Sequence, residues 1–328
     1  MNLFVNFTGT LKVQIPAGPI LEGIVIKSTG SWITVHGDDG KRMDCRLKGR
    51  FRIQGIRSTN PLAIGDRVEY HQEAGHATGV ITAIRERDNY IVRKAKKLSS
   101  ASHIIAANID QAWLVATLAD PRTSTGFIDR FLVTATGYFI PANIIFNKID
   151  IYNEDLLEQM RSLEEIYIQA GYPCYEVSAI RGDGVDALRE LLKDKVNLFS
   201  GHSGVGKSAL LKALDPRLDP KIGEISDVHR KGTHTTTFAE MFELATGGFI
   251  IDTPGIREFG LIHFDKTEIH RCFPEMDRLL PECQFANCTH IHEPGCAVIR
   301  GLDTGEVSRL RYNSYLSILN DELDNDRT

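Results

Sequence analysis

Two short motifs, and the order in which they occur, constrain the fold of this chain most strongly. GHSGVGKS, residues 201–208, matches the pattern G-x-x-x-x-G-K-[ST] in full and stands between an apolar run and a helical pattern. NKID, residues 147–150, ends another apolar run earlier in the chain. A phosphate loop links a strand to a helix in a parallel α/β sheet. In an ordinary GTP-binding domain it precedes the base-reading motif, so the inverted order predicts a rearranged nucleotide-binding domain.

The glycine-rich stretch has the chemistry that a phosphate group requires. Its glycines let backbone N–H groups turn toward phosphate oxygens, and the start of the following helix favours negative charge. Lys207 is expected to reach the β- and γ-phosphates, and the Ser208 hydroxyl to bind Mg²⁺. A glycine-rich turn without a ligand is the alternative. The candidate phosphate-binding residues are Gly201, His202, Ser203, Gly204, Val205, Gly206, Lys207, Ser208 and Ala209.

The NKID motif supplies Asn147, Lys148 and Asp150 as candidate base-binding residues at the end of a predicted strand. A carboxylate there can accept hydrogen bonds from N1–H and N2–H₂ of guanine, a pair of donors that adenine lacks. The stem of Lys148 can cover the base. Ser178 and Ala179, after the next predicted strand, suit a backbone loop that touches guanine O6. A strand-ending turn followed by a helix cap is the alternative.

IIDTPG, residues 250–255, predicts a loop that senses the γ-phosphate. Asp252 can hold the Mg²⁺ shell through water, and the N–H of Gly255 can meet the phosphate. A strand followed by a Pro-Gly turn is the simpler interpretation.

RKGTHTTT, residues 230–237, is polar and rich in hydroxyls. One threonine is expected to complete the Mg²⁺ shell in the GTP state, and both Thr235 and Thr236 qualify. Many small GTPases place a Gln after the glycine of the preceding motif, but this chain has Ile256 there. His234 is our candidate for the missing polar group, with a loop histidine of no special role as the alternative.

The rest of the chain predicts a multidomain protein with three parts. Residues 1–100 show short β-rich runs separated by turns, which favours an OB-fold barrel, with an SH3-like barrel as the alternative. Residues 101–262 alternate strands and helices, which predicts an α/β P-loop domain. Residues 263–328 predict a small helical domain that ends in an amphipathic helix.

The C-terminal part contains the spacing Cys283-x₄-Cys288-x-His290-x₅-Cys296. Three thiolates and one imidazole make a closed tetrahedral Zn²⁺ site, so one structural zinc ion is expected. On spacing alone His292 competes with His290 as the fourth ligand. Free thiols are the alternative.

Two basic stretches are candidates for RNA contacts. Gly40 to Arg57 carries seven cations against one acid, Asp44, and Phe51 lies among them, where it could stack on a base or belong to the core. The cations are Lys41, Arg42, Arg46, Lys48, Arg50, Arg52 and Arg57. RKAKK, residues 93–97, could add phosphate contacts. In the last helix Arg309, Arg311, Tyr312 and Tyr315 form a weaker candidate surface, where packing is the preferred interpretation of the tyrosines.

Charge and hydropathy exclude some classes. The net charge of −5 argues against indiscriminate nucleic-acid binding. The first residues lack a basic region followed by a long apolar run, and no stretch is long and apolar enough to span a bilayer. We therefore expect a cytoplasmic protein without a membrane partner.

The motif order NKID, SA, GHSGVGKS, THTT, DTPG, with a β-barrel before it and a Cys/His cluster after it, resembles the ribosome small-subunit-dependent GTPase A family, RsgA. The phrases AANIDQAWLV, FIDRFLV, DTPGIREFG and CTHIHEPGCAV match as well. The resemblance implies an OB-fold, a circularly permuted GTPase domain and a zinc domain. It implies a factor that binds the small (30S) ribosomal subunit and its 16S rRNA late in maturation and hydrolyses GTP to GDP and phosphate when stimulated by that subunit. We expect this factor to act as a monomer.

The resemblance also selects among residues. It favours Thr236 as the switch threonine and Mg²⁺ ligand, supports a catalytic role for His234 beside Lys207, and selects His290 over His292 as the zinc ligand. Because the zinc domain follows the γ-phosphate loop by a short connection, we expect its placement or its mobility to differ between the GTP and GDP states. Rival hypotheses are a GTPase of signalling or protein targeting, and an RNA-binding protein that uses GTP only as a structural ligand.

Overall fold

The computed structural model describes residues 19–29, 32–47, 62–93, 103–218, 240–252 and 266–325. Packing divides the chain into two compact units. The first contains the N-terminal strands together with a hairpin from residues 240–252, and the second contains three parallel strands, most of the helices and the C-terminal region.

The N-terminal strands form a closed barrel. They are β1 (Leu21–Thr29), β2 (Trp32–Gly37), β3 (Arg42–Leu47), β4 (Arg67–Gln72) and β5 (Gly79–Ile84). The strand order is β1-β2-β3-β5-β4, and β4 returns to pair with β1. All pairs are antiparallel except β3–β5. This closure confirms the predicted barrel, and the parallel β3–β5 pair gives it the OB-fold arrangement.

Alternation along the strands fills the barrel and leaves a polar outer face. On β2 the side chains of Ile33 and Val35 are buried, whereas Trp32 and Thr34 point outward. Gly23 on β1 lies where a Cβ atom would come within 2.5 Å of the carbonyl oxygen of His36. The close approach of β1 and β2 therefore requires glycine at this position.

The first unit has two further two-stranded elements. β6 (Tyr90–Arg93) and β7 (His103–Ala107) pair antiparallel. β12 (Glu240–Glu243) and β13 (Phe249–Asp252) form a hairpin, and β12 also pairs with β1 through Lys27 and Glu240. The first half of β1 thus completes the barrel, and its second half binds a segment that is distant in sequence.

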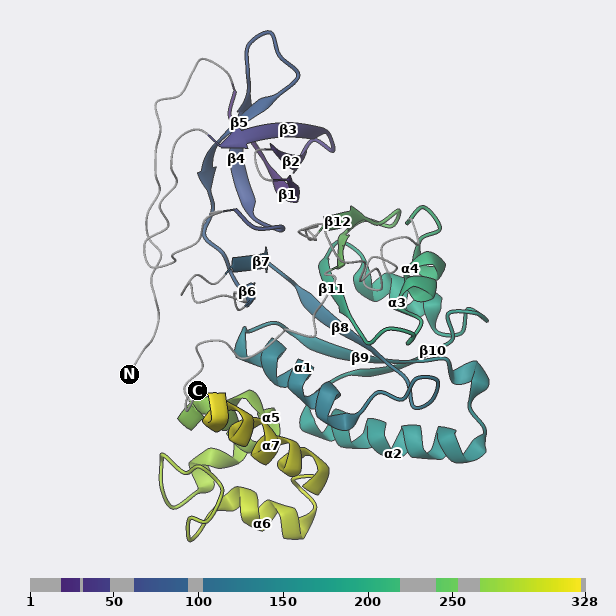
Figure 1. Cartoon of the computed structure of the whole chain (residues 1–328), viewed down its shortest axis with the longest axis vertical. Coiled ribbons are helices and arrows are strands. Elements are labelled where there is room, and N and C mark those ends of the chain that lie inside the picture. Colours follow the sequence, from purple (N-terminus) through teal and green to yellow (C-terminus); the bar gives the residue numbers. More distant parts are fainter. Residues whose placement is uncertain are drawn as a thin grey trace. The chain divides into compact units, whose positions relative to one another are not determined.

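The second unit is built on the parallel strands β8 (Gln111–Ala116), β9 (Ala142–Asn147) and β10 (Cys174–Val177), with β9 between the other two. Every residue of β8 and β9 is buried, as expected for strands covered on both faces. The helices that follow are α1 (Thr125–Gly137), α2 (Glu154–Ala170), α3 (Val185–Leu192) and α4 (Lys207–Leu214). Figure 1 shows α1 and α2 on one side of these strands, and α3 and α4 on the other.

The ends of α2 follow from its capping residues. The Asn153 side chain accepts a hydrogen bond from the N–H of Leu156, and Gly171 ends the helix with φ at 105°. An Asn before and a Gly after an amphipathic run are the start and stop signals that a helix shows in its sequence.

The C-terminal region is a small helical module. It contains the 3₁₀ helices η5 (Lys266–Cys272) and η6 (Leu280–Glu282), and α5 (Pro274–Leu279), α6 (Ala297–Thr304) and α7 (Arg309–Asn325). Its core includes Phe273, Met276 and Tyr315, and Val133 of α1 joins this core. The module is therefore packed onto α1 (Figure 1). Within the residues that the structure describes, no helix combines the length and apolarity needed to cross a bilayer.

Candidate functional site

The base-reading motif lies on a tight turn at the end of β9. Asn147 is the last residue of the strand, and Lys148 has a left-handed conformation with φ at 66°. Asp150 follows within the 3₁₀ helix η1 (Ile149–Ile151). The ammonium group of Lys148 donates to the carbonyl oxygen of Asp120, which holds its stem along the turn after β8.

Asn147 joins the three loops in which the sequence placed nucleotide contacts. Its side chain is 1% exposed. The Nδ2 atom donates to the carbonyl oxygen of Val205 in the glycine-rich loop at 2.9 Å. The Oδ1 atom accepts from the N–H of Ala179 at 3.2 Å. The two motifs that are inverted in the sequence therefore meet in space, and an uncharged side chain fixes their separation.

The carboxylate of Asp150 is oriented by the neighbouring loop. The Ser178 hydroxyl donates to Asp150 Oδ1 at 2.6 Å, and the same hydroxyl oxygen accepts from the N–H of Arg181 at 3.1 Å. Asp150 remains partly exposed, whereas Ser178 is fully buried. This arrangement holds one carboxylate oxygen in a fixed position at the surface.

The glycine-rich loop connects β11 (Val196–Ser200) to α4, which begins at Lys207. Val205 is fully buried and anchors the loop, while Ser203 and Gly204 are exposed. Gly206 has φ at 88°, and a Cβ atom there would lie 2.5 Å from Asn147 Nδ2. Glycine is thus needed at Gly206 for the loop to touch the base-reading turn.

Several predicted site residues lie outside the described part of the chain. They are His234, Thr235, Thr236, Gly255 and Ile256. The backbone of Asp252 ends β13, but its side chain also lies outside what the structure describes. Their predicted roles therefore stay predictions.

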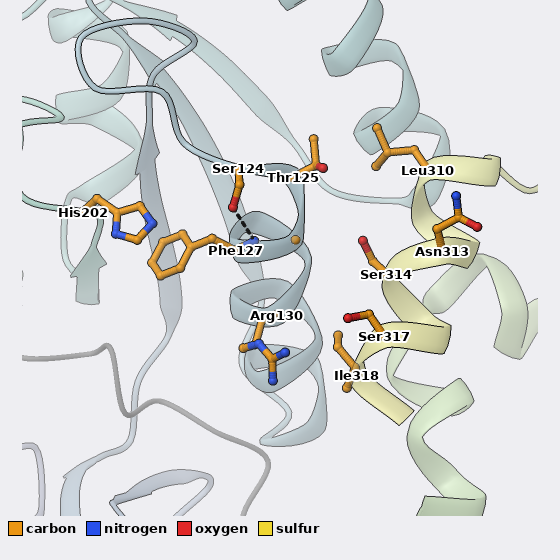
Figure 2. A pocket seen from close by; sticks show the side chains of 11 residues that line it. Ser124, Thr125, Phe127, Arg130, His202, Leu310, Asn313, Ser314, Ser317 and Ile318 are labelled. Carbon is orange, nitrogen blue, oxygen red and sulfur yellow. Dashed lines mark hydrogen bonds between the residues drawn. The ribbon is translucent and has the colours of Figure 1, made fainter. Parts of the chain in front are cut away.

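An aromatic contact links the glycine-rich loop to α1. The rings of His202 and Phe127 have centroids 3.7 Å apart and are tilted by 31°. They border an open pocket of about 570 Å³, whose other wall is formed by α7 residues such as Asn313 and Ser317 (Figure 2). Sequence reasoning missed Phe127, because nothing in TGFIDRFLVTAT distinguishes it from the apolar residues of the same helix that belong to the core.

The structure overturns one prediction for the last helix. Arg311 is fully buried rather than exposed. Its guanidinium donates to Asp129 of α1 at 2.7 Å and to both carboxylate oxygens of Glu275 at 2.8 and 3.1 Å. Burial would favour the neutral form, but Glu275 and Asp129 raise the pKa of Arg311 above its ordinary value. Arg311 ties the C-terminal module to α1 and offers no surface to RNA.

The four predicted metal ligands meet at one point in the C-terminal module. The ligand atoms of Cys283, Cys288, His290 and Cys296 all lie within 4.8 Å of one another. His290 Nδ1 is 3.6 Å from the sulfur of Cys283 and 3.4 Å from that of Cys296. His292 is exposed. The cluster has the donor set of a closed tetrahedral site and could hold a metal ion.

Burial of this cluster disfavours the charged forms of its thiols and its imidazole. Burial raises the pKa of the Cys288 thiol to about 12 and lowers the pKa of His290 to about 4. The neutral imidazole is the form that binds metal, whereas the thiols need a cation to stabilise their thiolates. The N–H groups of Ala297 and Ile299, at the start of α6, donate to the sulfurs of Cys283 and Cys296 at 3.3 and 3.5 Å.

Side chains outside the cluster hold its loop. The Tyr312 and Tyr315 hydroxyls donate to the carbonyl oxygens of His290 and Thr289 at 2.7 and 2.6 Å, which confirms the packing interpretation of both tyrosines. Glu293 accepts from Thr289, Ile291 and His292. Burial alone would raise the pKa of Glu293, but these hydrogen bonds lower it to about 2.

On the barrel, the structure describes only part of the basic stretch. Lys41 pairs with Asp39, and Arg42 pairs with Glu243 of β12. Arg46 lies over the ring of Trp32, with 4.2 Å between the guanidinium carbon and the ring centroid. The other members fall outside the described residues: Lys48, Arg50, Phe51, Arg52, Arg57 and residues 94–97.

Two family models match this chain. The model described as RsgA GTPase matches residues 84–262, and the one described as RsgA N-terminal domain matches residues 22–81. A protein of Bacteroides fragilis named small ribosomal subunit biogenesis GTPase RsgA is 53% identical over 304 residues, which cover 92% of this chain and 97% of that protein. A protein of the same name from Christiangramia forsetii is 51% identical and covers 94% and 98%.

Solved structures agree with these relatives. The crystal structure of YjeQ from Thermotoga maritima superposes with a TM-score of 0.78 at 34% identity, over 93% of this chain and 99% of that chain. The structure of YloQ, described as a circularly permuted GTPase, gives a TM-score of 0.74 at 29% identity, over 94% and 96%. A circular permutation of the GTPase fold explains why the two motifs are inverted in the sequence and yet meet in space through Asn147.

Proposed function

The chain belongs to the RsgA family of circularly permuted GTPases and is therefore a GTP hydrolase, and on this premise we propose that it acts in the biogenesis of the small ribosomal subunit. The relatives that are about half identical to it over nearly their whole length carry this function in their names. We propose that GTP hydrolysis, to GDP and phosphate, is stimulated by that subunit.

We assign the base-reading role to the turn after β9. Asp150 accepts hydrogen bonds from the guanine base, and Lys148 covers the base with its stem. Ser178 and Ala179 border the base on the other side. The observation that supports this assignment is the double hydrogen bond of Asn147, to Val205 and to Ala179, which fixes the base-reading turn beside the phosphate loop.

We assign the phosphate-binding role to residues 201–209. Backbone N–H groups surround the phosphates, and Lys207 stabilises the charge that develops on the transferred phosphoryl group. The hydroxyls of Ser208 and Thr236, with Asp252 through water, would hold the Mg²⁺ ion that accompanies GTP and neutralises phosphate charge. Thr235 is the neighbouring alternative to Thr236. Gly255 senses the γ-phosphate, and His234 orients the attacking water because Ile256 has no polar group.

We propose that the Cys₃His cluster holds one zinc ion with a structural role. The donor set of Cys283, Cys288, His290 and Cys296 supports this assignment, since three sulfurs and an imidazole leave no position for substrate. The module is small, and a bound ion would supply folding free energy that its core lacks.

The remaining assignments concern partners and organisation. We propose that the barrel contacts 16S rRNA, and that the protein works in the cytoplasm as a monomer. Functional domains are assigned to residues 1–100, 101–262 and 263–328, as the sequence predicts.

GTP turnover with and without purified small ribosomal subunits tests this proposal. We expect slow turnover alone and a large increase with subunits, which should weaken as salt screens the RNA contacts. ATP should not compete, and Asp150→Ala should abolish the preference for guanine. Equal rates with and without subunits at low salt would count against the ribosomal role, while the GTPase assignment would stand.

A further inference from the structure

The outer face of β2 and β3 carries three cross-strand pairs of polar or aromatic side chains. The register pairs Thr34 with Asp44 and His36 with Arg42, and the next pair in the same direction is Trp32 with Arg46. Because alternate residues point to one face, all six side chains lie on the outside of the barrel.

Two of these pairs are satisfied within the protein. The Thr34 hydroxyl donates to Asp44 at 2.7 Å. His36 and Arg42 both approach the carboxylate of Glu243, each at 3.2 Å, so the β12–β13 hairpin neutralises this end of the face. These groups have little left to offer a ligand.

The third pair is different. Trp32 is 36% exposed, although an indole ring on a strand surface gains most from burial. Arg46 is exposed, and within the described residues no carboxylate lies within ion-pair distance of it. The pair therefore presents an indole with a guanidinium stacked over it, and no described carboxylate pairs with that guanidinium, at the end of the face that the hairpin does not cover.

We infer that Trp32 and Arg46 form a binding site for an unpaired nucleobase of single-stranded RNA, with the base stacked on the guanidinium–indole pair and the adjacent phosphate paired with the guanidinium. Stacking on aromatic rings beside a cationic group is how proteins bind single strands, and the β2–β3 face is where OB-folds receive them. The inference rests on the proposed ribosomal function and gives it a site. Phe51, the aromatic residue singled out from the sequence, is not needed for it.

The two tryptophans of the chain make the site directly observable. Trp113 is fully buried and stacked on Phe199, so only Trp32 can meet a ligand. Titration of the whole protein with a single-stranded RNA of about twelve nucleotides, a length that one OB-fold can cover, should quench the fluorescence of Trp32 saturably. A duplex of the same sequence should not quench it. Trp113→Phe, checked by circular dichroism, should retain the full quenching signal.

Substitutions test the roles of the two side chains. Trp32→Leu should weaken RNA binding about tenfold or more, whereas Trp32→Phe should restore most of it because a stacking face remains. Arg46→Gln should lower the slope of log affinity against log salt by about 0.7, as expected for one lost phosphate contact on a single strand. Phe139→Ala, which removes another exposed aromatic ring, should leave RNA affinity unchanged.

Two results would overturn the inference: no quenching by single-stranded RNA, or unchanged RNA affinity in Trp32→Leu with a native melting temperature. Turnover with small subunits separates this failure from that of the proposed function. If subunits stimulate the wild type and Trp32→Leu equally, the ribosomal function stands and the site at Trp32 is wrong. If subunits do not stimulate the wild type, the ribosomal function itself fails.

Discussion

The turn at Asn147 and the loop from Cys283 to Cys296 both bring distant residues to one point, but they are held in different ways. The amide of Asn147 bonds to two backbone groups, so the protein itself closes the base and phosphate loops. The Cys₃His loop collects four donor atoms within 4.8 Å, and burial raises the pKa of Cys288 to about 12. The nucleotide loops are thus preorganised, whereas the Cys₃His loop, on our proposal, needs a bound cation to stabilise its thiolates.

The difference teaches where each ligand acts. A nucleotide should meet loops already in place, so its binding free energy can go into discrimination and catalysis. A metal ion should instead contribute to folding, because the cluster exists only in the folded module. Substitutions and ligand removal should therefore affect activity at the first region and stability at the second.

Removal of the metal should have the largest effect. Chelation, or Cys288→Ser, is expected to cost on the order of 10 kcal/mol in the C-terminal module and to unfold residues 266–325. Hydrogen exchange of this region measures it, with Cys174→Ser as a control because that thiol lies on β10 away from the cluster. If the module kept its native hydrogen-exchange protection without metal, its folding would not depend on the ion.

Loss of Arg311 should come next. Arg311→Met leaves Asp129 and Glu275 buried without their cation, which should cost about 3–5 kcal/mol. Chemical denaturation measures the loss, and Arg309→Met is the matched control, since that residue is exposed on the same helix. An equal stability for both variants would show that the module does not depend on this ion cluster.

Asn147→Ala should affect binding more than stability. Without the amide, the Val205 carbonyl and the Ala179 N–H lose their shared partner, and nucleotide affinity should fall about 10- to 100-fold, or about 1–3 kcal/mol. Calorimetry with GDP measures the affinity. Asn153→Ala should destabilise α2 by about 1 kcal/mol through its lost cap but leave GDP affinity intact. Similar affinities for the two variants would mean that the loops are not preorganised by Asn147.

Glu293→Gln should have the smallest effect and a defined pH dependence. The pKa of Glu293 is lowered from 4.5 to about 2, so its carboxylate contributes stability that is fully present above about pH 4.5 and lost as pH falls toward 2. At neutral pH the variant should lose about 1 kcal/mol, a modest amount because the carboxylate is partly exposed. Melting temperatures of both proteins across this range measure the difference. If the difference in melting temperature between the two proteins stayed constant down to pH 2, the lost stability would not come from ionisation of Glu293.

Local signals in the sequence were enough to predict the helices and strands and to locate the candidate nucleotide-binding loops. The caps Asn153 and Gly171 and the apolar runs of β8 and β9 act over a few residues, so the sequence carries them directly. Contacts between distant residues were harder to predict. Arg311 was assigned to the surface because its partner Asp129 lies 182 residues away, and a lone arginine on a polar helix is ordinarily exposed.

The metal ligand and the barrel aromatic illustrate the same limit. Spacing could not choose between His290 and His292, which are two residues apart, and only the folded loop buries one and exposes the other. Trp32 could have been found from the alternation in WITVHG, which places Trp, Thr and His on one face. The place of Arg46 over this ring could be known only from the register between two strands.

The pairing of β1 with β12 has a consequence for any attempt to divide this chain. A fragment that stops near residue 100 would keep the barrel but remove the strand that pairs at Lys27, leaving part of β1 as an open edge. Open edges recruit other strands, so we expect such a fragment to self-associate, and light scattering would detect it. A fragment fused to residues 240–252 should stay dispersed. The boundaries of recombinant fragments should therefore be placed where strand pairing ends, and not where the composition of the sequence changes.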